Sequence, residues 1–194
     1  GHGWPLGERS WINPSPNAPN LSMARAYAGT VMLEGTTLSE GRGTTRPLEI
    51  FGAPDLDARA VLGEMRTLAP HWLAGCQLRE ICFEPTFHKH AGQLCHGIQI
   101  HVDGPFYDHA AFRPWRLQAL AFKAIRQLHP DYPLWRDFAY EYEHERLAID
   151  LINGSPLLRE WVDDPAATPA QLDTLAAADE AAWRAATGDF LLYR

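Results

Sequence analysis

The chain has 194 residues and a formal net charge of −7; 46% of its residues are apolar and 21% are charged. This length and composition fit one globular domain with a sizeable core. The negative charge argues against a nucleic-acid partner, which needs a basic surface, and no apolar run approaches the roughly 18 residues of a membrane span. The chain begins Gly1-His2-Gly3 without Met, so we expect a processed or trimmed product that carries no signal peptide of its own.

The first predicted segment, residues 1–22, is a proline-rich arm or linker. Each X-Pro pair in it disfavours helical backbone at the residue before the proline, which predicts an extended path. Trp4 and Trp11 are costly to leave in water, so we expect them to pin the arm onto the body or onto a neighbouring domain. A short helical turn at 22–28 and a buried strand at 30–33 are predicted next.

Further strands are predicted at 48–51, 77–84 and 97–102. The last alternates strictly: Ile98, Ile100 and Val102 share one face, and Gln99 and His101 share the other. A strand with one apolar face and one hydrogen-bonding face can form the floor of a cleft for a polar ligand. The alternative is a solvent-facing sheet surface.

Helices are predicted from apolar spacing and end signals at 57–68, 112–128, 145–152, 155–162 and 168–186. The last begins with a capping box, Thr168-Pro169-Ala170-Gln171. Its expected buried residues are Leu172, Leu175, Ala176 and Trp183. The sequence therefore predicts an α+β fold: a small mixed β-sheet with flanking helices and a helix-rich C-terminal half.

The stretch 34–47, Glu-Gly-Thr-Thr-Leu-Ser-Glu-Gly-Arg-Gly-Thr-Thr-Arg-Pro, is the densest in chemical groups. Its glycines allow tight turns and a close approach of a ligand to the backbone. Glu34 and Glu40 are the pair of acids that glycoside or ester hydrolysis needs, one as proton donor and one as base or nucleophile. Arg42 and Arg46 offer planar forks for a carboxylate or phosphate. The alternative is an internal Glu–Arg network that holds the loop shut.

A second polar loop carries His88, Lys89 and His90. With Gln99 and His101, these side chains are predicted to line the opposite wall of the site. His88, His90, Cys95, His96 and His101 also offer ligands for zinc, but their spacing matches no known zinc pattern, and we expect no metal.

Other chemistries find little support in the sequence. The glycine-rich loop lacks the Lys-Ser/Thr ending of a phosphate-binding P-loop, and Ser39 lacks the Gly-x-Ser-x-Gly elbow of a serine hydrolase. No cofactor is expected. Three cysteines, Cys76, Cys82 and Cys95, favour reduced, buried thiols, although one disulfide among them stays possible.

Several motifs together resemble the DUF1343 family, whose characterised members are NamZ-type exo-β-N-acetylmuramidases. The resemblance is carried by the loop 34–47 and by Gly52-Ala53-Pro54, Phe83-Glu84-Pro85-Thr86-Phe87-His88-Lys89-His90, Cys95-His96-Gly97-Ile98-Gln99-Ile100-His101, Tyr140-Glu141-Tyr142-Glu143, Ile149-Asp150-Leu151-Ile152-Asn153-Gly154 and Leu191-Leu192-Tyr193. It covers nearly the whole chain. Asp55 departs from it, because an aromatic residue is expected there.

The resemblance implies that residues 23–194 form the family's C-terminal domain and that a Rossmann-like N-terminal domain precedes it. The active site is then expected in the cleft between the domains, where terminal N-acetylmuramic acid is released from peptidoglycan fragments in the periplasm or outside the cell. Arg42 or Arg46 would bind the lactyl carboxylate, Glu34 or Glu40 would act as acid, base or hydroxyl ligand, and Thr36 and Ser39 would contact the sugar. The competing expectation is a non-catalytic module that binds sugar or docks onto its partner domain.

Overall fold

The strictly alternating segment forms the central strand of the sheet in the computed structural model, which describes residues 9–191. Strand β3 (Cys95–His101) lies between β1 (Ile50–Ala53) and β2 (Gln77–Phe83) and pairs antiparallel with both. The sheet is therefore antiparallel in both pairings, where a mixed sheet was predicted. The α+β class is confirmed.

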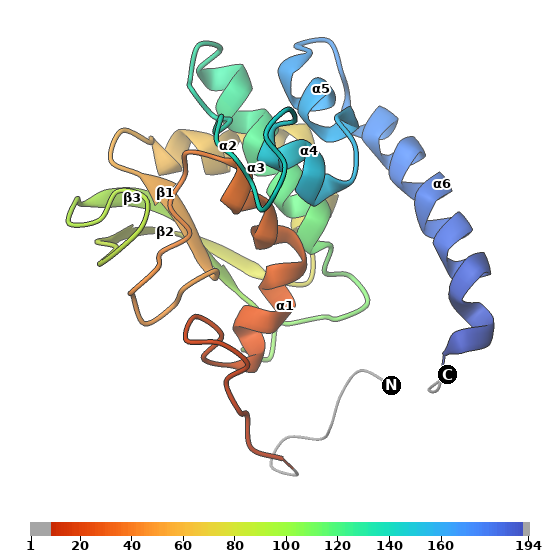
Figure 1. Ribbon diagram of the computed structural model, residues 1–194, viewed down its shortest axis with the longest axis horizontal. Helices are drawn as coiled ribbons and strands as arrows, with labels where there is room; N and C mark the ends of the chain where they lie inside the picture. Colours follow the sequence, from red (N-terminus) through yellow and green to blue (C-terminus); the bar gives the residue numbers. More distant parts are fainter. Residues whose placement is uncertain (1–8, 192–194) are drawn as a thin grey trace.

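Helices lie over one face of this sheet (Figure 1). The helices are α1 (Leu21–Thr30), α2 (Ala58–Leu68), α3 (Pro114–Leu128), α4 (Ala148–Asn153), α5 (Leu157–Asp163) and α6 (Pro169–Thr187), with 3-10 turns η1 (Val31–Gly35), η2 (Pro70–Leu73) and η3 (Gly188–Phe190). Helix α2 packs against β2 and β3, and α3 packs against α1, α2 and α5. The helical half thus forms a second layer over the sheet.

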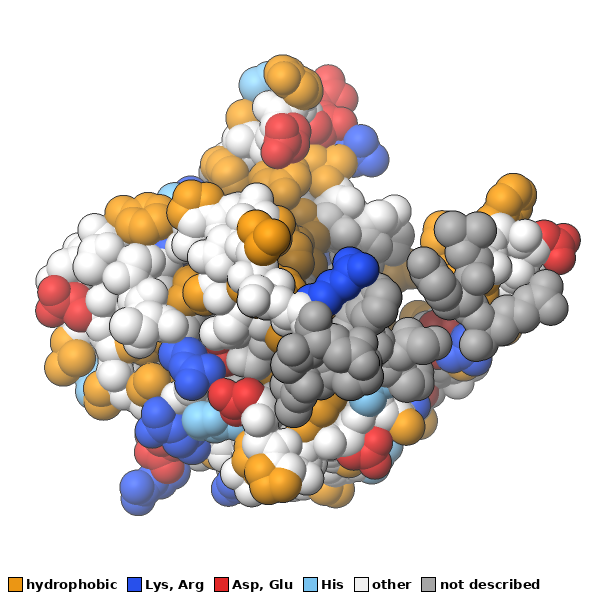
Figure 2. Space-filling view, turned by 90° about the horizontal axis from the view of Figure 1, so that it is seen from below, with side chains coloured by type: hydrophobic (Ala, Val, Ile, Leu, Met, Phe, Trp, Pro, Cys, Tyr) orange, Lys and Arg blue, Asp and Glu red, His pale blue; other side chains and the backbone are white. Residues whose placement is uncertain are grey.

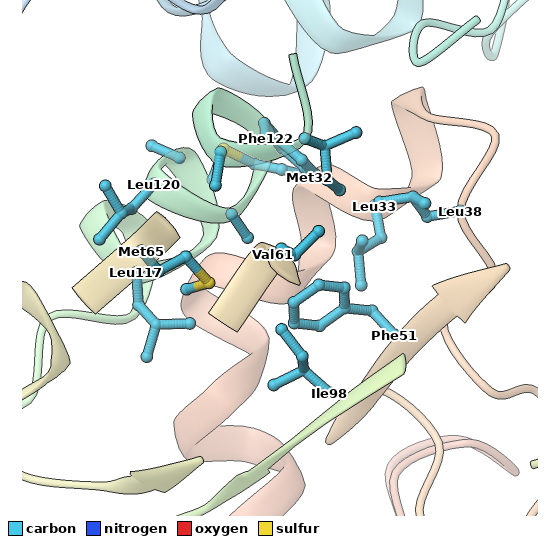
Figure 3. Packing of buried hydrophobic residues seen from close by; sticks show 14 of the residues in the cluster. Met32, Leu33, Leu38, Phe51, Val61, Met65, Ile98, Leu117, Leu120 and Phe122 are labelled. Carbon is cyan, nitrogen blue, oxygen red and sulfur yellow. The ribbon is translucent and has the colours of Figure 1, made fainter. Parts of the chain in front are cut away.

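The main core lies between these layers (Figure 3). Ile98 and Ile100 of β3 point into it, as their alternation predicts, and meet Phe51 of β1 and the apolar stripes of α2 and α3. Removing this apolar surface from water is the main source of stability. Gln99 lies on the opposite face of the sheet, beside a smaller apolar cluster of Ile50, Phe83 and Cys95.

The predicted strand at 30–33 is wrong, because this segment is helical. Helix α1 starts at Leu21, inside the predicted arm, and runs directly into η1. Asn20 fixes its start, since its side chain accepts a hydrogen bond from the Met23 N–H at 2.8 Å. Met32 and Leu33 are fully buried, and a short buried apolar run does not distinguish strand from helix.

Trp11 has a more local role than predicted. Its indole N–H donates to the Ala18 carbonyl at 2.8 Å, within the arm itself, and 40% of its surface is exposed. Trp4 lies outside the described residues.

Helix α6 starts as predicted but buries less than predicted. The capping box is present, with the Thr168 N–H donating to Gln171 Oε1 at 2.6 Å. It joins the body through buried Leu172 and through Arg116, which donates to Asp173 and, farther along the helix, to Glu180, both at 2.6 Å. Beyond Glu180 the helix runs away from the body (Figures 1 and 2). Leu175 and Trp183 are 44% and 70% exposed, so their predicted burial is wrong.

Two leucines one turn apart on α6 test this attachment. Leu172→Ala is expected to lower the free energy of unfolding by about 2–5 kcal/mol, because it leaves a cavity in the core. Leu175→Ala is the matched control and should cost less than about 1 kcal/mol, because 44% of this residue's surface is exposed and its removal leaves no closed cavity. Urea unfolding followed by circular dichroism measures both; equal losses would contradict the projecting helix.

Candidate functional site

The loop 34–47 is held in place by main-chain bonds at its centre. The Ser39 N–H donates to the Gly52 carbonyl at 2.8 Å, and the Gly52 N–H donates to the Ser39 carbonyl at 3.0 Å. Ser39 therefore pairs with β1 at the edge of the sheet. Gly43 has a φ of +79°, and a β-carbon there would collide with Thr86. This glycine therefore allows the loop to turn sharply and to lie directly against the second polar loop.

Glu40 lies at the centre of a buried ion cluster. Its side chain is 0% exposed, and it pairs with Arg42 Nε at 2.6 Å, Lys89 Nζ at 2.8 Å and His88 Nδ1 at 3.3 Å. Burial alone would raise the pKa of this carboxyl, but Lys89 and Arg42 outweigh burial and lower the pKa to about 2. Glu40 is therefore an anion at neutral pH.

Lys89 ties the second polar loop to η1. Its ammonium group also donates to the Leu33 carbonyl at 2.6 Å and to the Thr36 carbonyl at 3.1 Å. Burial, which outweighs the attraction of Glu40, lowers the pKa of this lysine to about 8. Beside it, His88 and His90 have φ angles of +70° and +58°. Non-glycine residues adopt this backbone only where the surroundings impose it, and functional sites are a frequent setting.

Glu34 occupies a more open position than Glu40. Its side chain is 23% exposed. One carboxylate oxygen accepts from Arg42 Nη2 at 3.1 Å and the other from the Tyr140 hydroxyl at 3.1 Å. Burial, followed by the negative charge of Glu34, raises the pKa of Tyr140 to about 12, so the phenol keeps its proton at neutral pH.

These groups border an open cavity of about 340 Å³. That volume suits a small ligand. The residues that line it are Glu34, Arg42, Phe87, His88, Arg136, Phe138 and Tyr140. The cavity thus joins one acid, two guanidinium groups and aromatic rings, a combination that can bind the polar edge and the apolar face of a sugar.

Four of these lining residues were not predicted as site residues: Phe87, Arg136, Phe138 and Tyr140. The last three alternate along a segment in which Asp137 and Ala139 are exposed. This period-two pattern was the available signal. The segment reaches the loop through main-chain bonds: the Thr37 N–H donates to Leu134 at 2.9 Å, and the Arg136 N–H donates to Gly35 at 3.0 Å.

Several predicted residues support the cavity without lining it. Thr36 and Ser39 are buried: the Thr36 hydroxyl donates to the Leu33 carbonyl, and the Ser39 hydroxyl accepts from the Gly41 N–H. His90 Nε2 lies 2.9 Å from the Thr37 carbonyl. Together with Lys89, these side chains fix the path of the two loops.

Three further predicted residues belong to other networks. Arg46 pairs with Glu49 at 3.0 Å and with Asp103 at 3.1 Å. Gln99 and His101 both accept hydrogen bonds from Arg79, at 2.5 and 2.9 Å. None of the three borders the cavity beside Glu34.

The thiols and imidazoles are dispersed. Cys76, Cys82 and Cys95 are all free, and Cys82 is exposed rather than buried. Within residues 9–191, no three histidine, cysteine or acidic side chains gather in a way that could hold a metal ion. In the same part of the chain, no helix is long and apolar enough to cross a membrane.

Comparison with known proteins identifies the class of this domain. Residues 25–193 match the family described as exo-beta-N-acetylmuramidase NamZ, C-terminal, and the chain belongs to that family. Over 121 residues it is 37% identical to the peptidoglycan beta-N-acetylmuramidase NamZ of Bacillus subtilis (strain 168). That match covers 62% of this chain and 28% of the relative.

The same fold occurs in two crystal structures of DUF1343 family proteins from Bacteroides fragilis NCTC 9343. One superposes with a TM-score of 0.72 over 95% of this chain and 45% of that protein, at 21% identity. The other has a TM-score of 0.62 over 94% of this chain and 44% of that protein, also at 21% identity. The chain therefore spans less than half the length of the proteins it matches.

Replacing the buried acid tests the ion cluster. Glu40→Gln is expected to lower the free energy of unfolding at pH 7 by about 3–5 kcal/mol, because it leaves Lys89 buried without its counter-charge. The pKa of Glu40 is lower in the folded state than in the unfolded state. The extra stability of the wild type over Glu40→Gln is therefore complete above the ordinary pKa of 4.5 and is lost as the pH falls towards about 2.

Denaturant unfolding of both proteins between pH 7 and pH 2 measures this difference. Glu84→Gln, a change at an exposed glutamate of the neighbouring loop, is the control and should change stability by less than about 0.5 kcal/mol. A difference between wild type and Glu40→Gln that stays constant with pH would show that the cluster does not depend on this charge.

Proposed function

We propose that this domain supplies one wall of the active site of a glycosidase that releases terminal N-acetylmuramic acid from peptidoglycan fragments. The observation that carries the proposal is the position of Glu34, the carboxylate that borders the cavity while held by Tyr140 and Arg42. Membership of the NamZ family supports the choice of substrate. As part of this proposal, the protein acts on peptidoglycan fragments in the periplasm or outside the cell.

Glu34 is the acid–base group of this proposal, and Glu40 is a positioning group. Glycoside hydrolysis commonly uses two carboxyl groups on opposite sides of the scissile bond. Glu40 is enclosed by three basic side chains and cannot reach a ligand, but it orients Arg42 towards Glu34. The second carboxyl group must then come from elsewhere, and the upstream domain that completes the family's longer proteins is the proposed source.

The aromatic side chains would bind the sugar ring. Phe138 and Tyr140 are in edge-to-face contact, with centroids 6.1 Å apart, so their orientations are mutually fixed. Aromatic faces can pack on the C–H face of a pyranose while the hydroxyl groups reach Glu34 and His88. Phe87, which is half exposed, closes the cavity from the second polar loop.

A second candidate function is a non-catalytic module that binds sugar or docks onto a partner domain. For the isolated chain, this function is favoured because the match covers only 28% of the length of the B. subtilis enzyme. An assay on a chromogenic N-acetylmuramide decides between the two. We expect little or no turnover by the 194-residue chain and turnover by a longer protein in which the upstream domain precedes it; turnover by neither would reject the glycosidase.

Substitution at Glu34 tests its role in that longer protein. Glu34→Gln should lower kcat by about 10²–10⁴-fold, because the amide can neither give nor take the proton. Tyr140→Phe should lower kcat less, since it removes one hydrogen bond to the same carboxylate. Glu84→Gln is the control that should leave kcat unchanged, and wild-type kcat in Glu34→Gln would remove this residue from the mechanism.

A further inference from the structure

The charged groups around the cavity are unequally paired. Glu34 and Glu40 carry two negative charges, and Arg42 and Lys89 carry two positive charges at 2.6–3.1 Å from them. Arg136 also lines the cavity, but it has no carboxylate partner among residues 9–191. One positive charge in the cavity wall is therefore unopposed by the protein.

We infer that Arg136 is the specificity residue of this site and binds a carboxylate on the saccharide. The inference rests on the proposed function and deepens it, because it restricts the substrates to sugars that carry an acidic substituent. In N-acetylmuramic acid that substituent is the lactyl ether carboxylate.

The surroundings of Arg136 prepare its guanidinium for this role. The group lies over the ring of Phe138, with its central carbon 4.0 Å from the ring centroid. The ring covers one face of the guanidinium and leaves its edge N–H groups available for a two-point bond to a carboxylate. Its backbone N–H is fixed to the Gly35 carbonyl at 3.0 Å. Both ends of the residue are thus held before a ligand arrives.

The two arginines of the loop 34–47 are less suited to this role. Arg42 already bonds to both glutamates, and a second anion would have to compete with them. Arg46 bonds to Glu49 and Asp103 and lies outside the cavity wall. The chain as a whole has a net charge of −7, which repels an anionic ligand, so binding requires a local positive group of this kind.

Binding of two sugars that differ in the carboxylate tests the inference on the 194-residue chain. N-acetylmuramic acid is the anionic probe and N-acetylglucosamine is the neutral one, both titrated by nuclear magnetic resonance. We expect the wild type to prefer the anionic sugar by about 10–100-fold, the range for charge-assisted hydrogen bonds. Arg136→Ala should abolish the preference, and Arg136→Lys should retain part of it because the charge stays while the planar fork is lost.

Arg66→Ala is the matched control, since Arg66 is an exposed arginine on α2 away from this cavity, and it should keep the preference. Arg136→Ala should shift the melting midpoint by less than about 3 °C, because no ion pair is lost. Equal binding of the two sugars by the wild type, no binding of either at about 100 mM, or an unchanged preference in Arg136→Ala would overturn the inference.

These outcomes separate this inference from the glycosidase proposal. If Arg136→Ala loses the preference while the longer protein cleaves no muramide, the carboxylate site stands and the proposed activity fails. If the longer protein cleaves muramides and Arg136→Ala still discriminates against the neutral sugar, the activity stands and the role of Arg136 is rejected.

Discussion

The buried carboxylate of Glu40 is the interaction on which the rest of the site depends. A charge without contact with water is tolerated only where opposite charges surround it closely. Glu40 meets this requirement through Arg42 of its own loop and Lys89 of the second polar loop. Through Lys89 the same cluster reaches the carbonyls that end η1. Electrostatic neutrality in the interior therefore dictates how the glycine-rich loop, the second polar loop and the first helical segment fit together.

Glu34 and Glu40 are the same residue type in one loop, but their surroundings differ. They are six residues apart and share Arg42 as a partner, yet one is enclosed and the other borders open space. Leu33 and Leu38, their neighbours in the sequence, are buried beside Phe51 (Figure 3). These apolar anchors set which acid faces inward and which faces the cavity, so the core determines the layout of the polar site.

Local rules predicted the elements whose patterns are unambiguous, such as the alternating strand β3 and the capped start of α6. They failed at Met32-Leu33, where two adjacent buried residues show no periodicity, and along α6, where apolar spacing gives no information on whether a partner surface exists. The predicted site residues lie on both loops that border the cavity, but the sequence could not separate Arg42, which borders it, from Arg46, which does not. That separation depends on Asp103, which is 57 residues away. Residues 136–140 of the cavity wall were missed. They alternate as strand residues do, but they lie in a connection between helices that forms no strand.

The contact between 35–37 and 134–136 has a consequence for how this family can change. Thr36 and Trp135 form an isolated β-bridge, and all the bonds that join the two segments there use backbone atoms. Backbone groups are the same for nearly every amino acid, so the outer wall of the cavity stays in register whichever side chains it carries. The side chains at 136 and 138 can therefore be exchanged without rebuilding the backbone scaffold that presents them.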